Sequence, residues 1–151
     1  DWGDGGHPHP LAVSWQMFLA GAAWAWNPKE FDESKLVRVL SRDFFGDSKI
    51  AGAAFKLGFA HKKLCVNAPN ETPLGTVIAA PKPETRELFC RNGFKWFAKI
   101  PTKKIRAALN EIEKQRAVLR RAKTKSNSGK ILSRELDLAT RMAAQSCKFM
   151  L

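Results

Sequence analysis

The sequence predicts an all-α fold of about six helices that ends in a long antiparallel helix hairpin. Apolar residues recur at three- and four-residue spacing along most of the chain, and no stretch shows the apolar–polar alternation of a half-buried strand. Glycine, proline and N-cap residues divide this pattern into separate segments. With 151 residues, 44% of them hydrophobic, the chain is long enough to bury a core.

The first segment, residues 1–10, holds three glycines, two prolines and two histidines, which is typical of a loop. The helix expected over residues 11–26 is apolar almost all round, so it should be buried on more than one side. Asn27 and Pro28 end it. Its apolar run is shorter than the roughly 20 residues that cross a bilayer, so we expect no membrane span.

Two more helices come next. The first begins near Asp32 or Ser34, and Gly46 closes it with a left-handed C-cap. The second begins at a cap supplied by Asp47 or Ser48. Both carry apolar residues at helical spacing, so each should pack one face on the core.

Residues 66–83 carry four prolines and predict a long irregular connection, with room for a short extended piece at residues 76–79. From Pro83 the pattern is helical again, and Pro101 marks another helix start. A polar turn at residues 124–129 separates the last two long helices. Because that turn is short, the two helices should pack as an antiparallel hairpin.

The net charge of +12 lies in the second half of the chain. Residues 1–81 hold eight basic and eight acidic side chains, whereas residues 82–151 hold 18 and six. This asymmetry fits a polyanion as partner, a solvated helix face, or a surface that meets an acidic neighbour. The basic run at residues 114–130 has no aromatic side chain on which bases could stack, so nucleic acid is a poor candidate.

The three cysteines Cys65, Cys90 and Cys147 are odd in number and form no CxxC pair. They predict reduced thiols, and with them a cytoplasmic location, rather than disulfides. His61 lies at the expected end of a helix, where a cation is favoured. No third group is evident that would orient it toward Cys65 for catalysis.

The most chemically suggestive residues are Trp2 and Asp4, followed by His7, in a glycine-rich loop. An indole face can stack on the C–H face of a pyranose, while a carboxylate accepts hydrogen bonds from two hydroxyl groups. His7 and His9 could also be imagined as metal ligands, but prolines interrupt them and no third ligand group is apparent. We therefore expect neither a metal nor another cofactor.

The run DWGDGGHPHPLAVSWQMFLAGAAWAWN resembles the last strand and following helix of the (β/α)₈ barrel in glycoside hydrolase family 20, the β-N-acetylhexosaminidases. The stretches LVRVLSRDFFGD, APNETPLGTV and ELDLATRMAAQSCKFML are similar to the helical tail that follows the barrel in bacterial members. The resemblance implies two parts: residues 1–27, a remnant of the barrel whose N-terminal loop derives from a strand end, and residues 28–151, a helical C-terminal domain. It implies that Trp2, Asp4 and His7 contact a terminal N-acetylhexosamine.

The family's catalytic pair is absent. Its members use an Asp–Glu pair at the end of a middle barrel strand, and the Asp orients the substrate's own acetamide. The one adjacent Asp–Glu here, Asp32 and Glu33, falls in the first turn of an expected helix and suits a helix cap. Glu111 and Glu113 cannot act together as a catalytic pair either, because residues two apart on a helix point to different sides. A solvated role is expected for Glu113.

We therefore expect no catalytic residue in this chain. The leading hypothesis is a C-terminal fragment of a glycoside hydrolase that binds sugar and partners a missing upstream barrel or a second copy of itself. Without a barrel, the chain should dimerise or cover Trp15, Phe18, Leu19 and Trp26 with its own later helices. The alternatives are a stand-alone basic module for anionic partners, bound through Arg116, Arg120 and Arg121, and a small glycosidase using Asp1 or Asp4.

Overall fold

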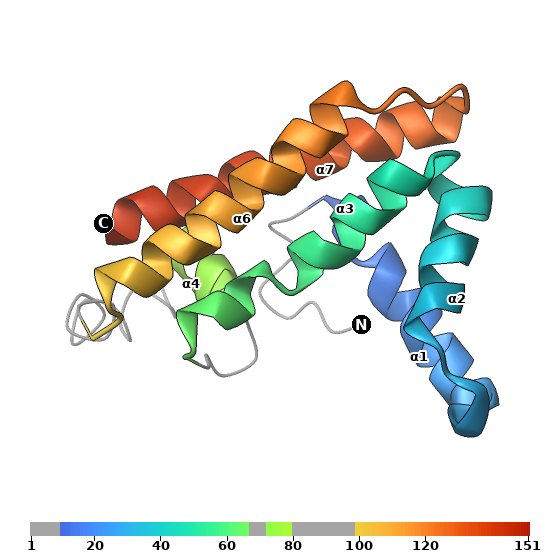
Figure 1. The fold of residues 1–151 in the computed structure, drawn as a ribbon, viewed down its shortest axis with the longest axis horizontal. Helices are drawn as coiled ribbons and strands as arrows, with labels where there is room; N and C mark the ends of the chain where they lie inside the picture. Colours follow the sequence, from blue (N-terminus) through green and yellow to red (C-terminus); the bar gives the residue numbers. More distant parts are fainter. Residues whose placement is uncertain (1–9, 67–71, 80–98) are drawn as a thin grey trace.

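The computed structural model describes residues 10–66, 72–79 and 99–151 (Figure 1). Every regular element in these ranges is helical and none is a strand, which confirms the predicted all-α class. The elements are η1 (Leu11–Val13), α1 (Trp15–Trp26), η2 (Pro28–Glu30), α2 (Glu33–Val39), η3 (Leu40–Phe45), α3 (Ser48–Gly58), η4 (Ala60–Leu64), α4 (Pro73–Ala79), α6 (Thr102–Arg121) and α7 (Asn127–Met150).

The two longest helices, α6 and α7, lie side by side and antiparallel, as predicted (Figure 1). Ile105, Ile112 and Leu119 lie seven residues apart on α6, so they share one face, and all three are buried. Ser126 caps the start of α7, and its hydroxyl accepts a hydrogen bond from the Gly129 amide at 3.2 Å. The hairpin therefore has a buried face along α6 and a capped start to α7.

Helices α3, η4 and α4 pack against the hairpin and complete its core. The core has two clusters of buried side chains. One joins η4 and α4 to the first half of α6 and the C-terminal end of α7. The other joins η1, α2, η3 and α3 to the end of the hairpin where α6 passes into α7. Both clusters draw on α6 and α7, so the hairpin holds the described parts of the chain together.

The predicted start and end of the second helix and the predicted start of the third are confirmed, whereas the third helix ends at Gly58, earlier than its apolar pattern suggested. Asp32 caps α2 by accepting a hydrogen bond from the Ser34 amide at 2.7 Å, and α2 continues into η3, a π-helical turn. Gly46 ends that turn with φ +64°, a left-handed conformation that glycine adopts without strain. Asp47 then caps α3. The sharp turn between η3 and α3 is therefore encoded locally.

The predicted irregular connection at residues 66–83 is wrong in its middle, where α4 forms instead of an extended piece at residues 76–79. Pro73 occupies the first helical position, which suits its fixed φ. The Thr72 hydroxyl accepts a hydrogen bond from the Gly75 amide at 3.1 Å and so starts the helix. The helix expected after Pro83 lies largely outside the described residues.

Helix α1 differs most from its prediction. It was expected to be buried on more than one side, yet none of its described residues is buried. The chain's own later elements cover only part of it: Leu19 packs on the core, and the Trp15 ring lies 5.2 Å from that of Phe44. Phe18 is exposed and Trp26 is 91% exposed, and α1 lies well away from the hairpin (Figure 1).

Candidate functional site

The predicted sugar-contacting residues Trp2, Asp4 and His7 lie outside the described residues, as does His9. The chain that follows them is anchored. Ala12, in η1, is 2% exposed, and its backbone amide donates a hydrogen bond to Glu135 Oε2 on α7 at 3.0 Å. The hairpin therefore fixes the point at which the predicted sugar-binding segment joins the helical body.

Several acids of the helical body have a structural partner. Asp32 is a helix cap, and its hydrogen bonds with Ser34 lower the pKa of its carboxyl group. Glu111 accepts a hydrogen bond from the buried Gln115 amide at 2.7 Å. Glu113 was expected to be solvated, but its carboxylate also forms an ion pair with the Arg116 guanidinium, at 3.7 Å. None of these arrangements brings two carboxylates onto one substrate.

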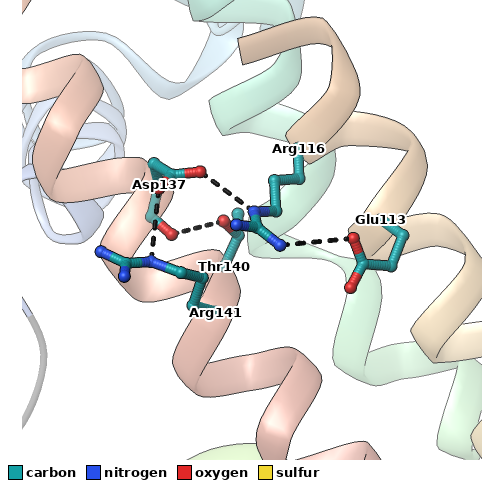
Figure 2. A network of polar contacts seen from close by, with 5 residues as sticks. All are labelled: Glu113, Arg116, Asp137, Thr140 and Arg141. Atoms are coloured by element: carbon teal, nitrogen blue, oxygen red, sulfur yellow. Dashed lines mark hydrogen bonds and ion pairs between the residues drawn. The ribbon is translucent and has the colours of Figure 1, made fainter. Parts of the chain in front are cut away.

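A network of charged residues joins α6 to α7 (Figure 2). Asp137 lies at its centre. One carboxylate oxygen is 3.0 Å from Nε of Arg116 and the other is 3.3 Å from Nε of Arg141. The Thr140 hydroxyl donates to the Asp137 backbone carbonyl at 2.7 Å. Because both Asp137 oxygens are engaged, the carboxylate holds two guanidinium groups in fixed positions.

Beside this network lies a shallow pocket of about 420 Å³. It is lined by residues of both hairpin helices: Leu119, Arg120, Ser133, Arg134, Asp137 and Arg141. Three of these six are arginines and one is a hydroxyl-bearing residue, so hydrogen-bond donors dominate the lining. The sequence indicated Arg120 through the basic run at residues 114–130. It did not indicate Arg134 or Arg141, which lie outside that run and meet Arg120 only once the helices pair.

The hairpin region, residues 99–151, holds 14 basic and four acidic side chains, a net charge of +10. Arg116, expected among the free cations of a polyanion surface, is instead paired with Glu113 and Asp137. Arg120 and Arg121 are exposed. The binding capacity of this face therefore rests on the arginines that the network does not use.

The described thiols have opposite surroundings. Cys147 is fully buried in the hairpin core, and burial raises the pKa of its thiol to about 11. Cys65 is exposed at a left-handed turn after η4. Burial lowers the pKa of His61, which disfavours its protonated form and speaks against the helix-end cation that the sequence suggested.

Within the described residues, no group of three or more His, Cys, Asp or Glu side chains is arranged to hold a metal ion. In the same part of the chain, no helix combines the length and apolar character needed to cross a membrane. Comparison of the chain with family models, with curated proteins and with solved structures finds no match.

Proposed function

We propose that this chain is the C-terminal part of a glycoside hydrolase that acts on terminal β-N-acetylhexosamine. In this proposal Trp2 stacks on the terminal sugar, and Asp4 and His7 bind its hydroxyl groups. Residues 1–27 complete a barrel and residues 28–151 form a helical domain behind it. The catalytic acid pair comes from the barrel.

The observation that carries the proposal is the state of α1. This helix is almost wholly apolar, yet it buries no residue, and Met17, Phe18, Trp24 and Trp26 are exposed along it. An outer helix of a (β/α)₈ barrel packs on the barrel strands on one side and on neighbouring helices on the others. If such a helix lacked the barrel strands and the neighbouring helices, its large apolar side chains would be exposed, as they are on α1.

The anchoring of η1 gives the proposal a second support. The hydrogen bond from the Ala12 amide to Glu135 ties the start of the described chain to α7. A sugar-binding side chain must be held to within a fraction of an ångström to be selective, and loops achieve this when a packed scaffold fixes their ends. The helical domain would supply that scaffold for the Trp2–His7 segment.

The roles found for the described acids agree with a catalytic pair located elsewhere. A general acid of a glycosidase needs a raised pKa and a second carboxylate a few ångströms away. Asp32 has a lowered pKa, and Glu135 and Asp137 each serve a different hydrogen-bonding partner. These groups stabilise the fold.

Sugar binding by the full chain tests the proposal. Titration with N-acetylglucosamine should shift the indole N–H resonance of Trp2 in a saturable way, and Asp4→Ala should weaken binding about tenfold, the value of one lost charge-assisted hydrogen bond. Asp1→Ala is the matched control, since it removes another acid of the same segment and should change affinity less than twofold. An unmoved Trp2 resonance, or equal losses in both variants, would contradict sugar recognition by this segment.

The same samples test the absence of catalytic acids. A chromogenic β-N-acetylglucosaminide should not be hydrolysed by the isolated chain. Turnover that disappears in Asp4→Ala would instead favour the small, independently active glycosidase.

The net charge of the hairpin region favours a second candidate function, a basic module for anionic partners. It predicts affinity for a polyanion that falls steeply with salt concentration. Neutralising Arg120 and Arg121 should remove much of that affinity without unfolding the chain, because both side chains are exposed. Arg116 is a poor choice for this test, since its ion pair with Asp137 joins the two helices.

A further inference from the structure

We infer that the pocket between α6 and α7 is a binding site for one oxyanion group, a phosphate or sulfate ester carried by a small ligand. The inference depends on the hairpin alone and not on sugar recognition by residues 1–10. It concerns the pocket lined by Leu119, Arg120, Ser133, Arg134, Asp137 and Arg141.

The first argument is the supply of unused donors. Neither Arg120 nor Arg134 makes an ion pair or side-chain hydrogen bond with any described residue. Arg141 uses its Nε on Asp137, which leaves its terminal nitrogens available. The Ser133 hydroxyl adds a further donor. A tetrahedral oxyanion has acceptors on every side, and guanidinium groups match it with paired N–H···O bonds.

The second argument is the state of the single acid in the pocket. Asp137 could repel an anion, but its two oxygens already face Nε of Arg116 and Nε of Arg141 (Figure 2). Its charge is thus offset inside the network, and it orients Arg141 from behind. The arginines that line the pocket therefore outnumber its one, already paired, carboxylate.

The third argument is shape. The pocket has a volume of about 420 Å³, within the range of small-molecule sites, and residues of both helices line it. A row of surface cations on one helix does not surround a ligand in this way. The lining holds no aromatic ring, so nothing here would stack nucleic acid bases. A small ligand with one anionic group and a modest apolar part fits this chemistry best.

The experiment uses phenyl phosphate and phenyl sulfate, which share a ring and differ in the oxyanion. Each is titrated into the full-length ¹⁵N-labelled chain at constant ionic strength, and the arginine Nε–H resonances are followed. We expect saturable shifts at Arg120, Arg134 and Arg141. Arg120→Gln and Arg134→Gln should each weaken binding about three- to tenfold, as expected for one charge-assisted hydrogen bond in a partly exposed site.

Arg121→Gln is the matched control, because Arg121 carries the same charge next to Arg120 but does not line the pocket. It should change affinity less than twofold. Equal weakening in Arg121→Gln and Arg134→Gln, or shifts that never saturate, would overturn the site in favour of diffuse attraction to a basic surface. Thermal unfolding of each variant verifies the fold, which these exposed side chains should not affect.

The two probes also separate the sources of the oxyanion. The second proton of a phosphate ester leaves with a pKa of about 6, whereas a sulfate ester keeps one charge. Affinity for phenyl phosphate that rises from pH 5 to pH 7, and exceeds that for phenyl sulfate at pH 7, assigns a phosphate ester. Tighter binding of phenyl sulfate at both pH values assigns a sulfate ester.

Discussion

The α6–α7 hairpin and the α1 helix are both helical and both carry apolar side chains, but they differ in how far those side chains are buried. The hairpin buries a regular face, in which Ile112 is 0% exposed, and the ion pair between Arg116 and Asp137 joins its two helices. The α1 helix is more apolar, yet none of its residues is fully buried, and Trp26 is 91% exposed. Apolar composition therefore indicates that a segment needs a partner, whereas the spacing of apolar residues indicates whether the chain supplies that partner itself.

The largest expected difference between the two regions is the cost of removing an apolar side chain. Ile112→Ala empties a fully buried site in the hairpin core and should lower the free energy of unfolding by about 3 kcal/mol. Trp26→Ala removes a larger but exposed side chain and should cost less than about 0.5 kcal/mol. Urea unfolding of both variants, followed by circular dichroism, measures the two values.

The contrast between the hairpin and α1 requires that Ile112→Ala lowers the free energy of unfolding much more than Trp26→Ala does. A loss above about 1 kcal/mol for Trp26→Ala, which a surface site should not give, would mean that α1 is covered in solution. A midpoint that also rises with protein concentration would assign the cover to a second copy of this chain, as the sequence first suggested.

Local signals explain why the hairpin and the α2–α3 turn could be predicted. Asp32, Gly46 and Asp47 act through their immediate neighbours, so their capping roles follow from the sequence. The α4 helix was missed because four prolines outweighed the local signal of Thr72 and Pro73. Proline marks the first turn of a helix as readily as it marks a loop.

Replacing glycine with alanine should lower the stability of the chain in the hairpin and raise it in α1. Gly129, in the first turn of α7, is buried against η3, and a Cβ there would collide with the Phe45 backbone carbonyl. Gly129→Ala should therefore destabilise the chain by about 2 kcal/mol. Gly21, in the middle of α1, has no atom near the position of an added Cβ. Gly21→Ala should stabilise the helix by about 0.5–1 kcal/mol.

Thermal unfolding midpoints of the two alanine variants test this contrast. A midpoint that falls for Gly21→Ala would reveal a contact of α1 in solution that the structure does not contain. Such a fall would sharpen the assignment of α1 as an interface helix. A midpoint unchanged for Gly129→Ala would show instead that α7 and η3 can move apart without loss.

The two candidate sites also differ in how far the sequence could predict them. Trp2, Asp4 and His7 could be suggested from side-chain chemistry within a few residues of sequence. The oxyanion pocket could not, because Arg120 lies on α6 while Arg134 and Arg141 lie on α7. Their proximity depends on the register of the hairpin, which Asp137 helps to fix through Arg116. Counting charges along the sequence identifies the basic second half of the chain, but it does not show where the arginine side chains come together.

The last contrast between the two regions concerns two glutamines. The side-chain oxygen of Gln16, on α1, is buried without a hydrogen-bond partner among the described residues, whereas Gln115, on α6, donates to Glu111 at 2.7 Å. Gln16→Met should raise the free energy of unfolding by about 1 kcal/mol, because it removes an unsatisfied carbonyl, and Gln115→Met should lower it by a similar amount. Urea unfolding of the pair measures both signs. If Gln16→Met instead destabilises the chain, the Gln16 oxygen has a partner in solution, and the α1 side of the core is as complete as the hairpin side.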